Sequence, residues 1–147
     1  MNTSQINEAL MDACANPETT LSQVEELIEA GADVKAADID DGWTALMYAA
    51  MYSTNPKVIS VLINAGADLE AVNKQNGWTP LMNAAAANSN PECASVLINA
   101  GADLEAKHVD DWTPLMVAAR YSAYPEVVAV LTKAGANLEA KNQDDWT

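Results

Sequence analysis

Basic residues are scarce in this chain of 147 residues, which has 7 lysines and arginines against 21 aspartates and glutamates and a formal net charge of −14. Nucleic-acid binding needs clustered basic side chains that neutralise phosphates, and no such cluster occurs here. The composition therefore predicts no nucleic-acid partner. A solvated acidic surface is the simpler interpretation of the charge, and a partner rich in basic groups is the alternative.

Long apolar runs and targeting signals are also missing. No segment approaches the roughly 18 apolar residues that a membrane-spanning helix needs, and residues 1–10 contain neither the basic nor the apolar part of a secretory signal. We therefore expect no membrane contact and a cytoplasmic location. The two cysteines, Cys14 and Cys93, lie on separate predicted helices, and we expect both to be reduced, buried apolar side chains.

Residue types that form catalytic or metal sites do not occur together. His108 is the single histidine, with no cysteine near it in the sequence, so a metal or catalytic role is not expected. The run from Asp38 to Gly42 lacks the spacing of a calcium loop, because Ala49 stands where a bidentate glutamate is required. Serine and threonine have no histidine partner for nucleophilic catalysis. We therefore expect no enzyme activity, no metal and no cofactor.

What the chain does contain is a repeat. Three similar segments open on WTALM or WTPLM and close on Ala-Gly-Ala, starting at Trp43, Trp78 and Trp112. In each segment the closing glycine follows the tryptophan by 23 positions, whereas the connector to the next tryptophan has 12 or 11. Packed helices cannot absorb an inserted residue but a surface turn can, so the constant block is the helical core. A period in the thirties predicts a stacked solenoid.

Capping residues predict two helices in each segment. A threonine caps the first helix, which is expected to end near Tyr52, Asn88 and Tyr121. A second helix is predicted to start at a dipeptide whose second residue is proline, at positions 55–56, 90–91 and 124–125. This helix should have about ten residues and end at a glycine in the left-handed conformation. A polar stretch before the next tryptophan predicts a turn or hairpin-like finger.

These residues resemble the ankyrin repeat, whose signature contains T-P-L-H and G-A-D and whose unit is a β-turn finger followed by two antiparallel helices. The resemblance covers almost the whole chain. It implies an all-α repeat solenoid, a stack of helix-turn-helix units joined by β-turn fingers. The signature histidine is methionine at Met47, Met82 and Met116, so apolar packing replaces its hydrogen bonds. The turn between the helices is also one residue longer than the usual form.

The resemblance predicts one domain over residues 1–147. We expect a cap repeat at about 4–34, repeats at about 43–77, 78–111 and 112–145, and the start of a further repeat at 146–147. Acidic side chains keep the outer surface of the cap repeat soluble. At the other end we expect Val127, Val128, Val130 and Leu131 to leave apolar surface in water. Two interpretations stay open, a longer array or weak self-association through this end.

The resemblance also implies a function, the binding of a protein or peptide on the concave face that fingers and first helices form. The candidate residues lie in the fingers, just before the threonine cap, or at variable positions of the first helix. They are Asp40, Asp41, Trp43, Tyr48, Met51, Tyr52, Trp78, Asn83, Asp110, Asp111, Trp112, Arg120 and Tyr121.

Aromatic side chains offer large contact areas, and the finger acids would engage basic groups. Two alternatives stay open. The tryptophans, including Trp146, could serve only to pack neighbouring fingers, and the segment could be a structural spacer with no partner of its own.

Overall fold

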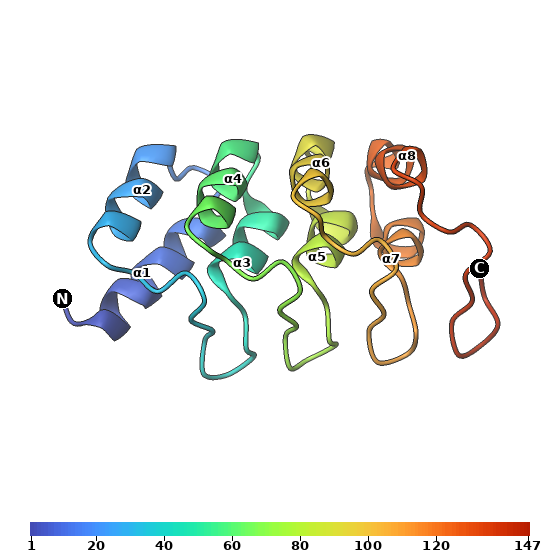
Figure 1. The fold of residues 1–147 in the computed structure, drawn as a ribbon, viewed down its shortest axis with the longest axis horizontal. Coiled ribbons are helices and arrows are strands. Elements are labelled where there is room, and N and C mark those ends of the chain that lie inside the picture. Colours follow the sequence, from blue (N-terminus) through green and yellow to red (C-terminus); the bar gives the residue numbers. More distant parts are fainter.

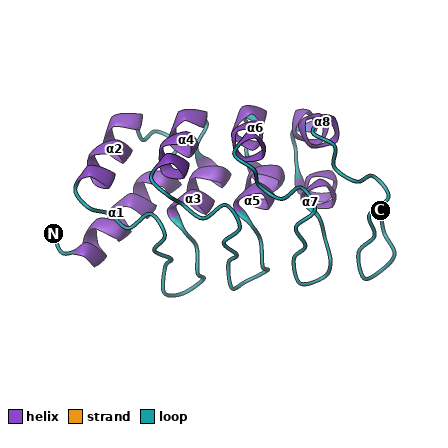
Figure 2. Ribbon diagram, viewed as in Figure 1, coloured by secondary structure: helices purple, strands orange, loops and turns teal.

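The computed structural model describes all 147 residues, folded as eight helices joined by loops (Figure 1). No β-strand is formed, as Figure 2 shows, and an isolated bridge between Ala37 and Thr44 is the only β-type pairing. The helices form four pairs: α1 (Thr3–Ala15) and α2 (Leu21–Glu29), α3 (Ala45–Tyr52) and α4 (Pro56–Asn64), α5 (Pro80–Ala87) and α6 (Pro91–Asn99), and α7 (Pro114–Tyr121) and α8 (Pro125–Lys133).

We name the pairs the cap repeat, the first full repeat, the central repeat and the last full repeat, in chain order. In Figure 1 the first helices of the pairs form one row and the second helices form another. The loops that precede α3, α5 and α7, and the loop that follows α8, project as four fingers. The contacts agree with this arrangement, because α1, α3, α5 and α7 pack in sequence, as do α2, α4, α6 and α8. The expected all-α stack is confirmed.

The predicted caps start the helices. The hydroxyl of Thr44 accepts a hydrogen bond from the backbone N–H of Met47 over 3.3 Å, and Thr79 and Thr113 make the equivalent bond. Asn55 caps α4 in the same way by accepting from the N–H of Lys57 over 3.0 Å. These bonds satisfy donors that have no partner inside the helix, so each short helix has a fixed start.

A glycine ends each second helix. Gly66, Gly101 and Gly135 follow α4, α6 and α8 with φ of 99°, 103° and 100°, in the left-handed region where a side chain is strained. The chain then turns back toward the fingers. The prediction that a left-handed glycine ends the second helix is confirmed.

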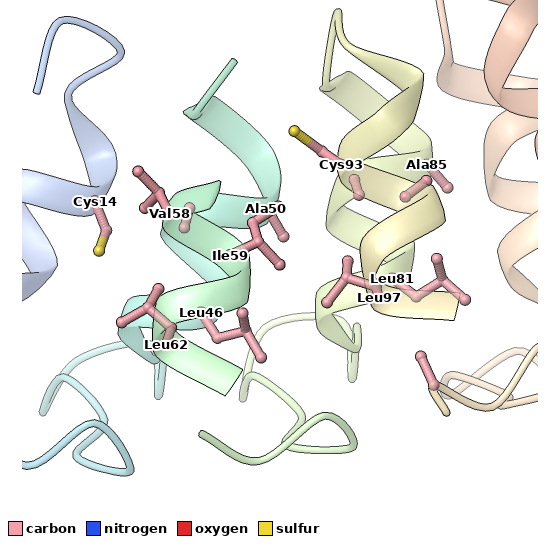
Figure 3. Close-up of a cluster of buried hydrophobic side chains, with 14 of the residues drawn as sticks. Cys14, Leu46, Ala50, Val58, Ile59, Leu62, Leu81, Ala85, Cys93 and Leu97 are labelled. Atoms are coloured by element: carbon pink, nitrogen blue, oxygen red, sulfur yellow. The ribbon is translucent and has the colours of Figure 1, made fainter. Parts of the chain in front are cut away.

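The core runs through all four repeats without interruption. Figure 3 shows leucine and valine side chains of second helices meeting leucine and alanine side chains of first helices, among them Leu46, Ala50, Leu81 and Ala85. The alanines at the centre of the first helices let the helix backbones approach closely. No repeat could bury its apolar surface alone, so each depends on its neighbours.

One asparagine links the first full repeat to the central repeat. The buried Asn88 donates from Nδ2 to the carbonyl oxygens of Ala50 and Ser53, over 2.8 and 2.9 Å. Nearby, Asn90 donates to the carbonyl oxygen of Thr54 over 2.8 Å. These bonds satisfy carbonyl groups at the end of α3, which would otherwise lack a helical partner.

The C-terminal end of the stack differs from the expectation. Val127 and Leu131 are fully buried, because α8 packs against both α6 and α7, so the prediction that they leave apolar surface in water was wrong. Val128 and Val130 are half-buried. The exposed apolar side chains at this end are instead Leu138, which is 58% exposed, Trp146, which is 64% exposed, and Ala119 of α7.

Neither cysteine forms a disulfide and both are buried, as expected. Burial raises the pKa of the Cys14 thiol to about 12 and that of the Cys93 thiol to about 11. Both groups therefore stay protonated near neutral pH, which makes them poor nucleophiles.

No helix in the structure has both the length and the apolar character that crossing a bilayer requires.

Leu81 is the sharpest test of this packing. Its side chain is almost fully buried in α5, which packs against both α3 and α7. Leu81→Ala is expected to lower the free energy of unfolding by about 2–5 kcal/mol, because the cavity cannot close from either side. Denaturant unfolding followed by circular dichroism measures the change. The control Leu138→Ala alters an exposed leucine and should change stability by less than about 0.5 kcal/mol; equal effects would contradict the assignment of α5 to the core.

Candidate functional site

Each finger is held by one polar residue at its base. The backbone N–H of this residue donates to the carbonyl oxygen of the tryptophan at the end of the finger, over 2.8 Å in the first finger and 3.2 Å in the second. Its side chain then accepts hydrogen bonds from backbone N–H groups of the finger turn. The four finger-base residues are Asp38, Asn73, His108 and Asn142.

Asp38 joins the first finger to α3. Its Oδ1 accepts from the N–H groups of Asp41 and Gly42, and its Oδ2 accepts from the hydroxyl of Tyr48 over 2.8 Å. Partial burial acts to raise the pKa of Asp38, but the hydrogen bonds outweigh it and hold the pKa below its ordinary value. Desolvation and the bond to Asp38 together raise the pKa of Tyr48 to about 12. The pair therefore stays bonded at neutral pH.

His108 has the same structural role in the third finger. Its Nδ1 accepts a hydrogen bond from the backbone N–H of Asp110 over 3.2 Å, which requires the neutral ring. Desolvation lowers the pKa of His108, against the opposing charges of Asp110 and Asp111. The structure groups no three or more histidine, cysteine, aspartate or glutamate side chains where they could hold a metal ion.

The residue before each tryptophan adopts a left-handed conformation. It is Gly42 and Gly77 in the first two fingers, with φ of 72° and 69°, and Asp111 and Asp145 in the last two, with φ of 62° and 61°. Aspartate tolerates this region better than most residues. The shorter connectors therefore keep the same finger shape without glycine, and every tryptophan enters its helix from the same direction.

The tryptophans lie partly buried along the fingers. Trp43, Trp78 and Trp112 are half-buried, whereas Trp146 is 64% exposed. The ring of Trp43 packs on Tyr48 with centroids 5.1 Å apart, and the ring of His108 stacks on Trp112 at 6.0 Å. The tryptophans thus pack against neighbouring side chains of the fingers and helices. This packing covers part of the surface of Trp43, Trp78 and Trp112.

Tyr121 bridges two tryptophans at the end of α7. Its ring centroid lies 5.7 Å from that of Trp78 and 6.2 Å from that of Trp112, while the guanidinium of Arg120 lies 5.7 Å from the Tyr121 ring. The Tyr121 side chain is nevertheless 55% exposed. Together with His108 these rings form an aromatic cluster that joins the central repeat to the last full repeat.

A second apolar cluster lies below these rings. Met82, Ala86 and Val117 are buried together, and the rings of Trp78 and Trp112 pack against them. Methionine stands here in place of the histidine of the ankyrin signature, and Met82 is fully buried in this apolar cluster, as expected.

One predicted site residue is not accessible. Asn83 is fully buried in α5, so it does not lie on the exposed surface where the sequence pattern predicts it; the equivalent Val117 is fully buried as well. This helix position faces the neighbouring repeat. Sequence variation there changes the packing between repeats and does not change the exposed surface. Neither Nδ2 nor Oδ1 of Asn83 has a hydrogen-bond partner, and neither does Nδ2 of the buried finger-base residue Asn73.

The other predicted residues keep some exposure. Tyr52 is 44% exposed, Arg120 is exposed, and Met51 is half-buried. Among the finger acids, Asp40 and Asp110 are exposed whereas Asp41 and Asp111 are half-buried. The chain has one ion pair, an exposed contact of 4.0 Å between Lys141 and Asp145, so none of these finger acids is in a salt bridge. The basic group nearest to Asp40 and Asp41 is the ammonium of Lys74, which donates to the carbonyl oxygen of Ile39 over 2.8 Å.

The finger-base residues were missed from sequence because their identity changes from aspartate to asparagine to histidine. The signal that could have found them is positional: each is a hydrogen-bond acceptor that precedes its tryptophan by five residues in the longer fingers and four in the shorter ones.

Asn83 generates a stability prediction. Replacing it with valine, the residue at the equivalent position of α7, removes two unpaired polar atoms from the core. Asn83→Val is expected to raise the free energy of unfolding by about 1–3 kcal/mol, as measured in urea. The matched control is Asn88→Val, which removes an asparagine that is bonded and should destabilise the protein. A loss of stability in Asn83→Val would show that the Asn83 amide is satisfied in solution.

His108 generates a prediction about pH. Folding lowers the pKa of His108 below its ordinary value of about 6.5. As the pH falls through that value, the unfolded chain therefore binds more protons than the folded chain, and protonation favours unfolding. The His108 contribution to stability is therefore complete above that pH and is lost below it. NMR titration of the single imidazole should give a pKa below that of the same residue in urea-unfolded protein. An equal or higher pKa in the folded state would contradict the finger-base role.

A search of curated proteins finds no match for this chain. The family model for ankyrin repeats, in three copies, matches residues 2–73 and 54–142, which overlap and together span most of the sequence. The match agrees with the paired helices, the left-handed glycines and the projecting fingers of the structure. The chain therefore belongs to the ankyrin repeat family.

Proposed function

We propose that the chain is a non-catalytic interaction module that binds a polypeptide on the face formed by the fingers and the first helices, here called the finger face. Ankyrin repeats are generally protein–protein interaction modules, and their fold is typically non-catalytic. Stacked repeats of this kind create extended concave surfaces suited to such binding.

The single observation that carries the proposal is the exposure of Tyr121 above two tryptophans. A ring that contacts Trp78 and Trp112 and still leaves 55% of its side chain accessible offers rigid aromatic area at low entropic cost. A residue needed only for packing would be buried at this place. Arg120 lies beside the ring and adds hydrogen-bond donors to the same surface.

Charge favours a basic partner for this face. The fingers carry Asp40, Asp41, Asp110 and Asp111, and none of these forms an ion pair within the chain. Unpaired acids beside exposed aromatic rings attract a partner that carries lysine or arginine, and the attraction speeds association at low ionic strength.

The test is a pull-down with immobilised wild-type protein beside the double variant Trp78→Ala/Tyr121→Ala, with retained proteins identified by mass spectrometry. A partner captured by the wild type should be lost from the variant, because the exposed ring of Tyr121 and the half-buried ring of Trp78 are both removed. Circular dichroism must show that the variant is still helical.

Tyr124→Ala is the matched control, because Tyr124 is an exposed aromatic residue in the turn before α8 and outside the cluster. Retention of the partner by the folded double variant would reject the finger face as the site. Empty lanes for every protein would favour the structural spacer.

A further inference from the structure

The central repeat differs from both neighbouring repeats at two positions of its first helix. One position lies between the finger base and the helix stack, and the other lies at the C-terminal end of the helix. In the three full repeats these positions hold Tyr48 and Tyr52, Asn83 and Ala87, and Val117 and Tyr121. Only the central repeat has no tyrosine at either position.

The first full repeat shows what a tyrosine does at the inner position. The ring of Tyr48 packs on Trp43 with centroids 5.1 Å apart, and its hydroxyl donates to Oδ2 of the finger-base residue Asp38 over 2.8 Å. A phenol therefore fills the space between the tryptophan and the finger base, and its polar end is bonded there.

Asn83 does not replace that interaction in the central repeat. The side chain is too short to make the Tyr48-type bond, and it forms no hydrogen bond with the finger-base residue Asn73. Three buried polar atoms at these positions consequently lack a partner: Nδ2 and Oδ1 of Asn83 and Nδ2 of Asn73. Buried amide atoms are nearly always paired in folded proteins, so an unpaired group of this size calls for a ligand group that supplies both a donor and an acceptor.

The last full repeat shows what a tyrosine does at the outer position. Tyr121 lies against both Trp78 and Trp112, above the buried Val117. At the equivalent place the central repeat has Ala87, a small and exposed side chain, so Trp43 and Trp78 have no such ring between them.

From the repeat register we infer that Met51 lies over Asn83. Val117 packs on Ala86 of the preceding repeat, and the equivalent of Ala86 one repeat earlier is Met51. Met51 is half-buried, and its unbranched side chain changes rotamer at little cost. Movement of Met51 would open a path from the finger face to the unpaired amide atoms.

We propose that the finger face takes a tyrosine side chain of a partner polypeptide between Trp43 and Trp78, above Ala87, with its hydroxyl bonded to Asn83 and Asn73. The inference rests on the proposed function, since it names the residue that the partner inserts. A phenol hydroxyl donates to Oδ1 and accepts from an Nδ2 group, and the ring packs on indole as Tyr48 and Tyr121 do.

The same surroundings reject a phosphorylated tyrosine. Asp40 and Asp41 of the first finger form no ion pair, and the nearby ammonium of Lys74 already donates to the carbonyl oxygen of Ile39. A phosphate would add about −1.5 to −2 charges beside the two acids. Lysines that flank the partner's tyrosine would instead be attracted. The site therefore distinguishes tyrosine from phosphotyrosine as well as from phenylalanine.

The experiment uses short lysine-flanked peptides that differ only at one central residue, which is tyrosine, phenylalanine, phosphotyrosine or leucine. Binding to the 147-residue chain is followed by NMR through the tryptophan indole N–H signals, assigned with single Trp→Phe variants. The tyrosine peptide should shift the signals of Trp43 and Trp78, and it should bind up to roughly tenfold more tightly than the phenylalanine peptide because it alone pairs the amide atoms.

Two variants test the two halves of the site. Asn83→Val should reduce the affinity for the tyrosine peptide to that of the phenylalanine peptide, and the loss cannot come from unfolding, because this variant is expected to be more stable. Ala87→Tyr should fill the space from within the chain and abolish binding. Ala87→Ser, which keeps a small side chain, is the matched control and should bind as the wild type does.

Equal binding of the tyrosine and phenylalanine peptides would overturn the proposal, as would unchanged binding of the tyrosine peptide by Asn83→Val. The proposal would also fail if only the indole signal of Trp146 shifted, or if no indole signal shifted at millimolar peptide. These failures leave the proposed function intact if the pull-down still captures a partner through Trp78 and Tyr121. Loss of that capture would reject both.

Discussion

Burial of each repeat against the next is the interaction on which the rest of the structure depends. The helices have eight or nine residues in the three full repeats, too few to be stable alone, and their apolar side chains are covered only when the stack forms. The finger positions follow from this, because each finger is held at its base and delivers its tryptophan to a helix that the stack has fixed. The surface on the fingers is therefore anchored to the core.

Most of the fold could be predicted because its signals are local. Threonine caps, prolines at the second helix and the closing glycines act within one turn of chain, and the structure has all of them where the sequence predicts. The burial of individual side chains was harder. Asn83 was assigned to the surface because it varies between repeats, yet variation at that position alters packing between repeats. Val127 and Leu131 were assigned to an exposed end, but their own helix turns them toward α6 and α7.

The face that carries function combines two properties that rarely coexist, aromatic packing and unneutralised acid. The rings of Trp78, Trp112 and Tyr121 hold one another in place, so little conformational freedom remains to be lost when a partner binds. The acidic fingers around them stay hydrated and keep such an apolar surface from associating nonspecifically. Asn83 breaks the pattern, since it is a buried polar group without a hydrogen-bond partner and lowers the stability of the isolated chain.

The asparagine link between repeats is not repeated along the stack. Asn88 and Asn90 tie the central repeat to the first full repeat. At the equivalent positions of the last full repeat, the Ser122 hydroxyl bonds only to the backbone of Tyr124, and neither side chain bonds to the central repeat. The two joints on either side of the central repeat are therefore held differently: side-chain amides bonded to carbonyl groups support the first joint, and the rings of Trp78, Trp112 and Tyr121 support the second. Loss of one of these rings would consequently weaken the joint to the last repeat, whereas loss of an asparagine would weaken the joint to the first full repeat.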